Sequence, residues 1–210
     1  MRIPLGTVLI SFALAAAAGC ITGQALYLPG GLARPVPKGP APAAAGATVA
    51  VVDFARSPSI SEEIGRDYDH VRAIRWRGSP GKTIADLVAG ALAEKGYKVL
   101  RVPDGNSVPA DAAIRVWGTV DEFRVDAKRV KRVKAESAAR VTATIYASGG
   151  GTPPGWNAAI SSEYSYDDPF VTPEGVRSAM NGAANGVADE ALRRLTAAGI
   201  LPAPSPPRAE

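Results

Sequence analysis

Thr48-Val49-Ala50-Val51-Val52-Asp53-Phe54 is the stretch that decides the fold. It is a continuous apolar run of strand length, which predicts a strand buried on both of its faces. The polar segment 56–69 follows it, and apolar and polar residues then alternate over 71–76, as in a half-exposed strand. We therefore expect a loop over 56–69 and a second strand over 71–76.

Residues 81–94 predict a helix that packs on these strands. Its apolar positions recur at the spacing of one helix face and are Ile84, Leu87, Val88, Ala91 and Leu92. Ser79 suits the N-cap, Pro80 the first helical position and Gly96 the position after the C-terminus. A strand is expected directly afterwards, over 97–102, so that strand, helix and strand form a crossover unit.

Three long strand-like segments follow, over 112–125, 139–147 and 156–166. In the first, the parity of the apolar residues changes midway, and a β-bulge near Asp121-Glu122 accounts for the change. A loop rich in Gly and Pro, 149–155, joins the last two segments. We expect these segments to form a three-strand meander.

A second helix is expected after Thr172, because Pro173 and Glu174 suit its first turn and Gly199 its end. Its apolar stripe comprises Val176, Met180, Ala183, Val187, Ala191, Leu192 and Leu195. These elements predict an α+β fold, a two-layer sandwich whose mixed, mostly antiparallel sheet of about five strands has two helices packed on one face. The single domain spans 48–199, and the Pro-rich tail 200–210 is expected to be disordered.

The first residues have the pattern of an export signal. Arg2 precedes the apolar run 3–18, and Ala17-Ala18-Gly19-Cys20 is typical of a lipobox. The run is shorter than the about 20 apolar residues that a membrane-spanning helix needs. We expect a lipoprotein signal peptide over 1–20, with Cys20 acylated after cleavage. An ordinary signal peptide with an incidental Cys20 is the alternative.

The segment 21–47 is rich in Pro, Ala and Gly and has no periodicity, which predicts a linker that holds the domain off the membrane. Docking of 25–28 on the domain is the alternative. In a Gram-negative host, Ile21 in place of an Asp after Cys20 favours the outer membrane, facing the periplasm. The several acyl chains of a processed lipoprotein cysteine anchor a protein stably, whereas a single chain does not.

Composition limits the kinds of partner that the protein can bind and the interactions that can stabilise its domain. The chain has 210 residues, one cysteine and one histidine, and a formal net charge of +4. An acylated cysteine cannot form a disulfide, so the domain must be stabilised by its own core. The mild positive charge fits an anionic envelope surface, and we expect neither a nucleic-acid nor a nucleotide partner.

The order of elements resembles the YajG-like family of envelope lipoproteins. The matching features are the lipobox, Val51-Val52-Asp53 with Arg56 and Ile64-Gly65 after it, the helix end Ala91-Leu92-Ala93-Glu94-Lys95-Gly96-Tyr97, the meander, and the helix from Pro173 to Leu195. The resemblance covers most of the chain after residue 20, and it implies this fold and an envelope location without supplying catalytic residues. A looser likeness exists to the auxiliary lipoproteins of envelope ABC transporters.

Two motifs invite a catalytic or nucleotide-binding interpretation, and neither is complete. Gly81-Lys82-Thr83 opens a helix, but the first glycine of a phosphate-binding loop would fall at Trp76. His70 has neither a second histidine nor a free cysteine with which to form a zinc site or a nucleophile pair. We expect a protein that is not an enzyme and that has no cofactor.

Clusters of carboxylates occur at Glu62-Glu63, Asp67, Asp69 and Asp167-Asp168. Such groups bind calcium or hydrolyse glycosides when they converge, but these clusters lack EF-hand spacing. We interpret them as caps of polar loops and expect no metal site.

The run Lys128-Arg129-Val130-Lys131-Arg132-Val133-Lys134 is the strongest local concentration of charge. It lies between two predicted strands, so one interpretation is a solvated hairpin tip. The other is contact with anionic lipid headgroups, lipopolysaccharide or a cell-wall polymer, each basic group contributing about 1 kcal/mol near such a surface. The residues concerned are Lys128, Arg129, Lys131, Arg132 and Lys134.

Together these features predict a non-catalytic lipoprotein of the bacterial envelope, anchored in the membrane through Cys20. We expect a binding or scaffold module for a protein partner or an anionic envelope component. The alternative is an accessory lipoprotein of an ABC system that transports lipid or glycolipid, which predicts an apolar groove between sheet and helices. A hydrolase is disfavoured because no nucleophile–base pair is present.

Overall fold

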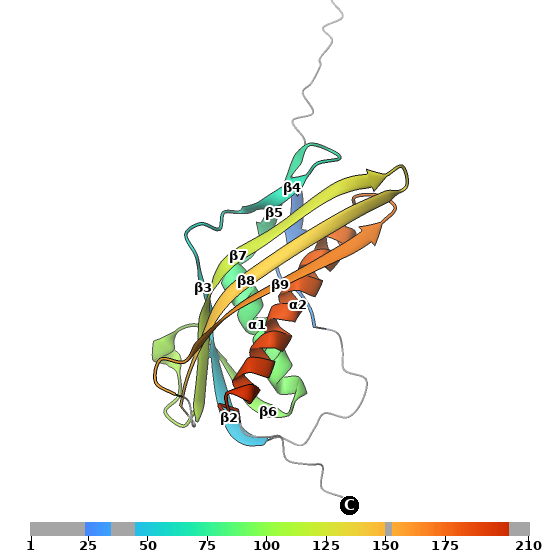
Figure 1. The fold of residues 1–210 in the computed structure, drawn as a ribbon. Helices are drawn as coiled ribbons and strands as arrows, with labels where there is room; N and C mark the ends of the chain where they lie inside the picture. The colour runs from blue at the N-terminus through green and yellow to red at the C-terminus, as the bar shows by residue number, and fades with distance from the viewer. Residues whose placement is uncertain (1–23, 35–44, 150–152, 202–210) are drawn as a thin grey trace, which may run out of the picture.

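The computed structural model describes residues 24–34, 45–149 and 153–201. They form one nine-stranded sheet and two α-helices (Figure 1). The elements are β1 (Leu26–Pro29), β2 (Ala45–Val52), β3 (Ala55–Arg56), β4 (Glu63–Asp67), β5 (Arg72–Arg77), α1 (Pro80–Glu94), β6 (Tyr97–Val102), the short 3-10 turn η1 (Gly105–Ser107), β7 (Ile114–Lys131), β8 (Lys134–Gly149), β9 (Asn157–Asp168) and α2 (Pro173–Ala197). The α+β class with two helices is confirmed, whereas the expectation of about five strands is wrong.

The long strand β7 is the centre of the sheet. On one side it pairs antiparallel with β8, and β8 pairs antiparallel with β9, which completes the expected meander. The register of β7 against β8 shifts between Val120 and Glu122, so the bulge near Asp121-Glu122 is confirmed. Val141 and Ile145 of β8 are fully buried on the inner face.

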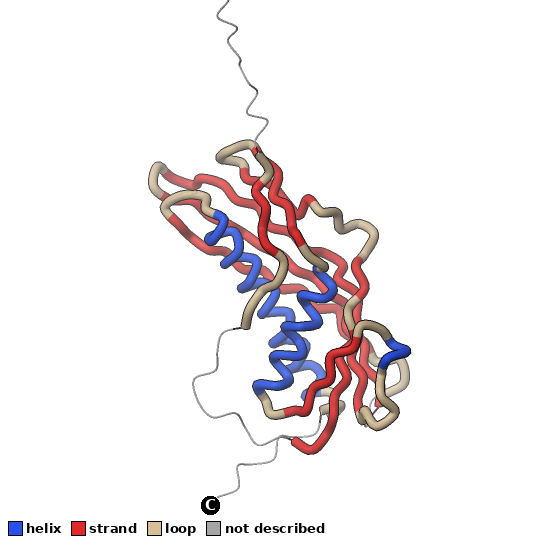
Figure 2. The backbone as a smooth tube through the Cα atoms, turned by 180° about the vertical axis from the view of Figure 1, so that it is seen from behind, coloured by secondary structure: helices blue, strands red, loops and turns tan. Residues whose placement is uncertain are grey.

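On its other side, β7 pairs with two separate groups of strands. Near its start it lies parallel to β2, which carries β6 on its outer edge. Near its end it meets β4 at Ala127, and β5 and β1 extend the sheet from there. The two-residue β3 pairs with Thr119 and Val120, between the two groups. The sheet therefore divides into two branches along β7, and Figure 2 shows them from behind.

Both helices lie on one face of the sheet, with α2 against β8 and β9 and α1 against β6 and α2 (Figure 2). The expected caps are present. The Ser79 hydroxyl accepts a hydrogen bond from the Lys82 N–H, and the Thr172 hydroxyl accepts one from the Gly175 N–H. The apolar stripes of both helices, except the partly buried Leu192, are buried in one continuous core with the inner face of the sheet.

The segment 56–69 is not the continuous loop that its polarity predicts. It contains β4, in which only Ile64 and Asp67 are buried, and the strand is held by pairing with β5 and with Ala127. Gly65 allows β4 to approach β7 closely, because a Cβ at this position would overlap the carbonyl oxygen of Val125.

The linker interpretation of 21–47 is wrong for residues 24–34, and the docking alternative is confirmed over β1. Leu26 and Leu28 are buried in the core, and β1 lies parallel to β5. The guanidinium of Arg34 then contacts Glu94 of α1 at 2.7 Å and Asp189 of α2 at 2.8 Å. The domain therefore begins before residue 48.

The C-terminal boundary of the domain also differs from the expectation. Ile200 and Leu201 are buried in the core, so the expected disordered tail does not begin at residue 200. The signal peptide over 1–20, Cys20 itself, and the segments 35–44 and 202–210 lie outside the described residues.

Candidate functional site

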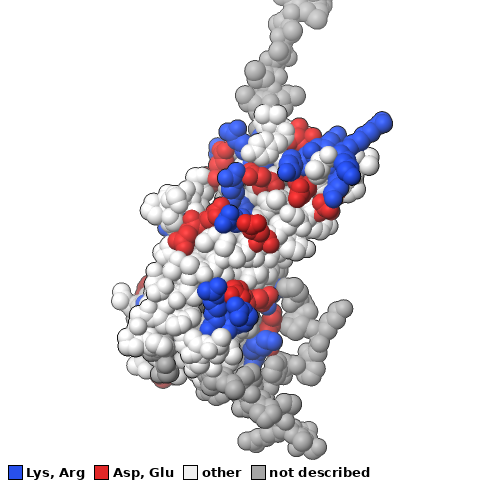
Figure 3. Space-filling model, viewed as in Figure 1, with Lys and Arg blue, Asp and Glu red and all other residues white. Residues whose placement is uncertain are grey.

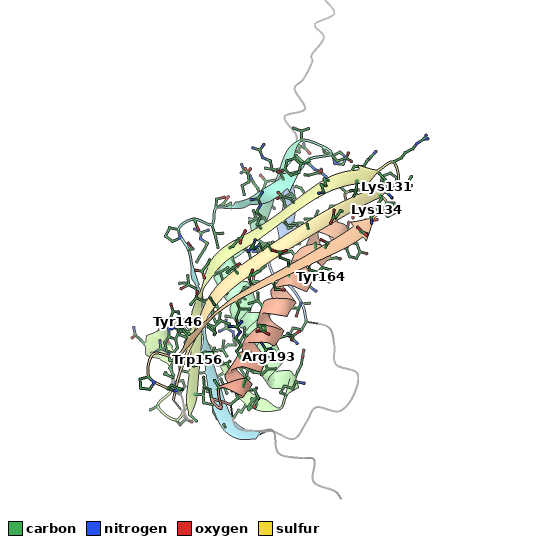
Figure 4. The ribbon with its side chains drawn as sticks, in the orientation of Figure 1. Lys131, Lys134, Tyr146, Trp156, Tyr164 and Arg193 are labelled. Atoms are coloured by element: carbon green, nitrogen blue, oxygen red, sulfur yellow. The ribbon has the colours of Figure 1, made fainter. Side chains whose placement is uncertain are left out.

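Three loops meet at one end of the molecule, which we call the hairpin end. They are the β4–β5 turn (Tyr68–Val71), the β7–β8 tip (Lys128–Lys134) and the β9–α2 connection (Pro169–Thr172). Arg129 links all three, because its Nη2 lies 2.9 Å from Asp69 Oδ2 and its guanidinium carbon lies 6.0 Å from the centre of the Phe170 ring. Figure 4 shows Lys131 and Lys134 at the tip.

The five basic residues lie together at the tip, as the sequence predicts. In the structure, three of them form ion pairs with described residues and two do not. Lys134 Nζ lies 2.7 Å from Asp167, Lys128 Nζ lies 3.9 Å from Glu136, and Arg129 is paired as above. Lys131 and Arg132 are exposed and form no ion pair with any described residue. Figure 3 shows basic side chains projecting from the tip beside acidic ones. The net positive charge of the tip therefore comes from two residues.

Large apolar side chains are also exposed at the hairpin end. Of the eight that are exposed in the described chain, five lie on its three loops. They are Tyr68 (55% exposed), Val71 (83%), Val130 (47%), Val133 (72%) and Phe170 (57%). Single exposed apolar residues are ordinary on protein surfaces, but five of them gathered at one end make this end the candidate interaction surface.

The β4–β5 turn is built around Asp67, whose side chain is completely buried. Its Oδ2 accepts from Arg72 Nε at 2.8 Å and lies 2.8 Å from His70 Nδ1, and its Oδ1 accepts from the backbone N–H of Asp69 and His70. Burial alone would raise the pKa of Asp67, but the hydrogen bonds from His70 and Arg72 outweigh it and lower the pKa below its usual value. The turn is therefore rigidly held.

This turn forces Val71 into an unusual conformation. Its φ is +50°, and it is the only described residue other than glycine with a positive φ. A β-branched side chain is a rare occupant of the left-handed region, where it costs about 1–2 kcal/mol. The expectation that Val71 begins a strand is wrong, because β5 begins at Arg72 and Val71 stands exposed at the tip of the turn.

The N-terminal segment joins the domain at this same end. In β1, Leu26 lies opposite Ile74 and Pro29 opposite Arg77, so β1 starts close to the β4–β5 turn and runs away from it. Figure 1 shows β1 beside β5 at the end that carries the β7–β8 tip. Residues 24 and 25, the first that the structure describes, therefore lie at the hairpin end.

The expectation that the carboxylates cap polar loops is confirmed for two of them. Asp67 caps the β4–β5 turn together with His70, and Asp168 accepts from the Thr172 hydroxyl at 2.9 Å. Asp69 and Asp167 instead form ion pairs with Arg129 and Lys134. Within the described residues no three metal-ligating side chains converge. Gly81 is the second residue of α1, and a Cβ there would overlap the carbonyl oxygen of Phe54, which occupies the space beside the helix start.

Two open grooves lie elsewhere on the described surface. The first, of about 470 Å³, lies where the sheet divides, between 59–68 and the bulged part of β7. Arg66 lies near Glu63 and Arg124 contacts Asp126, and Asp121 and Glu122 add two further carboxylates, so the lining is acidic overall. The second, of about 700 Å³, lies between the C-terminal ends of the helices around the paired Arg34. Both grooves are lined by charged residues of both signs.

The sequence interpretation missed the apolar half of the hairpin end. Val130 and Val133 alternate with basic residues in the charged run, which was a usable signal. The contributions of Tyr68, Val71 and Phe170 depend on tertiary contacts that bring distant loops together. None of the described helices is long and apolar enough to cross a bilayer.

Comparison with known proteins supports the fold. No family model matches the chain. No curated protein matches it either. A DUF330-family protein from Xanthomonas campestris has a similar structure, with a TM-score of 0.56 and 14% sequence identity over 84% of this chain and 97% of that one. This likeness shows a shared fold.

Two other solved structures align less well. A minor lipoprotein from Acinetobacter baumannii is 11% identical over 78% of this chain and 99% of its own, with a TM-score of 0.33. A PelC dodecamer from Paraburkholderia phytofirmans is 19% identical over 73% and 92%, with a TM-score of 0.38. At TM-scores below 0.5, neither alignment supports a conclusion about this chain.

Proposed function

We propose that this protein is a non-catalytic lipoprotein of the bacterial envelope, anchored through Cys20, whose hairpin end faces an anionic envelope surface. The observation that carries the proposal is the position of β1. The chain after the lipobox pattern meets the domain at the end where Lys131 and Arg132 are exposed and form no ion pair with the described residues. An acylated Cys20 would thus hold these two cations toward the surface in which it is anchored.

The anchor is tested by metabolic labelling with palmitate. Wild-type protein is expected to incorporate label and Cys20→Ser is expected to lose it, because the thiol is the acylated atom. Equal labelling of the two proteins would contradict the proposal. An outer-membrane, periplasm-facing location is part of the same proposal, and fractionation of the labelled membranes tests it.

The electrostatic contact is tested on vesicles that contain phosphatidylglycerol. In a Cys20→Ser background, the double substitution Lys131→Gln and Arg132→Gln is expected to weaken co-sedimentation at low salt by up to about 2 kcal/mol, or roughly thirtyfold. The matched control, Lys128→Gln with Lys134→Gln, removes the same charge but from residues that are already ion-paired. An equal loss in both would show that net charge matters and that the two free cations do not.

The role of an accessory transport lipoprotein is a second candidate that the fold permits. It predicts an apolar groove between sheet and helices, but in the described residues that space is filled by the core. The groove beside Leu192 and Ala197 is the apolar surface open to a lipid chain. Lipid that co-purifies with the protein and is lost on Leu192→Glu would favour this role.

A further inference from the structure

Docking of the N-terminal segment leaves very little chain between the proposed anchor and the domain. Only six residue-to-residue steps separate Cys20 from Leu26, the first residue of β1. A fully extended chain rises at most about 3.3–3.6 Å per residue, so this distance cannot exceed about 22 Å. If Cys20 is acylated, as the proposed function holds, the start of β1 must lie within that distance of the lipid.

The hairpin end is the part of the domain that this short reach brings to the membrane. β1 starts beside the β4–β5 turn, and Arg129 joins that turn to the β7–β8 tip and to Phe170. The three loops therefore approach the lipid together.

The chemistry of these loops matches the interfacial zone of a bilayer. Val71 and Val133 project from two different tips and are 83% and 72% exposed, and Phe170 is 57% exposed. Lys131 and Arg132 lie directly before Val133 and are free of described ion-pair partners. Proteins that bind an anionic membrane surface combine two features. Their apolar side chains reach the boundary of the acyl chains, and their cations lie beside these at the level of the headgroups.

The strain at Val71 supports the same conclusion independently. A positive φ at an exposed valine lowers the stability of the isolated domain, and the buried Asp67 fixes the turn that imposes it. Strain of this kind persists only where the surrounding structure enforces it, and it clusters at functional sites. Insertion of the side chain into lipid would provide that function.

We propose that the hairpin end inserts Val71, Val133 and Phe170 into the interfacial region of an anionic phospholipid membrane and so fixes the orientation of the anchored domain. The long axis of the meander then points away from the lipid. Asn157, at the far end of β9, lies roughly 36 Å along the strand from Asp168, given a rise of about 3.3 Å per residue. A partner would therefore meet the far end and the sides of the domain.

The test measures membrane depth in the acylated full chain, reconstituted in vesicles of phosphatidylglycerol and phosphatidylcholine. An acylated Cys20 has no free thiol, so one introduced cysteine carries the only nitroxide label. The labelled variants are Val71→Cys and Val133→Cys, and the exposed Asn157→Cys is the control. Collisions of the label with oxygen and with a water-soluble nickel complex report its depth.

Labels at 71 and 133 are expected to collide more with oxygen and less with nickel than the label at 157. The inference is overturned if all three labels collide with oxygen and with the nickel complex as often as a label in water does. Spin–spin broadening at 71 or 133 would show that a second copy covers the hairpin end, and would overturn it as well. Palmitate measured on the same sample separates the two proposals. If the protein carries palmitate but its nitroxide labels remain exposed to water, only the insertion is refuted. If Cys20 carries no palmitate, both the anchor and the insertion that rests on it are refuted.

Discussion

Replacing Leu28 by alanine tests whether the N-terminal segment belongs to the folded domain. Leu28 is completely buried, lies opposite Trp76 in the parallel pairing of β1 with β5, and belongs to the main core. A loose linker would lose no stability on this change. A docked strand should lose the transfer free energy of the side chain and the cost of the cavity that it leaves.

The expected loss is about 3 kcal/mol, near the lower end of measured Leu→Ala changes, because β1 is a short edge strand that can relax around the cavity. For a domain of this size, 1 kcal/mol corresponds to about 2–4 °C, so the midpoint of thermal unfolding should fall by roughly 6–12 °C. Circular dichroism of the purified chain in non-ionic detergent measures the midpoint.

The neighbouring residue provides the matched control. Tyr27 lies on the opposite face of β1, is 46% exposed, and stacks under the Arg77 guanidinium at 4.2 Å. Tyr27→Ala should therefore cost no more than about 1 kcal/mol. If Leu28→Ala unfolds at the same temperature as Tyr27→Ala, then β1 does not contribute to the core, and the short reach from Cys20 inferred from its docking is wrong.

Three further substitutions test single contacts by urea unfolding. Asp67→Asn should cost about 3 kcal/mol at pH 7, because it removes a buried charge from its hydrogen-bond donors. The folded pKa of Asp67 lies below the unfolded value of 3.8, so this stabilisation is present above about pH 4 and is lost as the pH falls through the folded pKa. The difference from wild type should therefore shrink at pH 3, and a constant difference would contradict the role of the charge. Gly65→Ala should cost about 3 kcal/mol, because the new Cβ overlaps backbone at Val125; a neutral result would show that β4 does not approach β7 so closely. Arg34→Met keeps the aliphatic stem but removes the contact with Glu94, and should cost about 2 kcal/mol, whereas an unchanged urea midpoint would show that the ion pair is not stabilising.

The helices were predictable from sequence because their determinants are local. The Ser79 and Thr172 caps bond to backbone N–H groups three residues ahead, and the apolar stripes repeat within each helix. The bulge in β7 was also predictable, because a change in side-chain parity records which residues face the core.

The missed strands depend on distant parts of the chain. β4 contains one buried apolar residue, Ile64, and becomes a strand through pairing with β5 and β7. β1 ends in Pro29 and is followed by Gly30, and its two buried leucines are too few to establish a period. In the site, the charged run was evident, but the exposure of Val71 and Phe170 follows from tertiary structure.

The docked segment changes what an anchor at Cys20 would do. A linker over 21–47 would let the domain rotate freely and sample partners at a distance from the membrane. A connection of at most about 22 Å that enters at the hairpin end allows little rotation, because that end carries side chains suited to the interface. The anchor would then set orientation as well as location. We therefore expect a partner to bind at one of two surfaces. These are the groove where the sheet divides, between β4 and β7, and the far end of the meander.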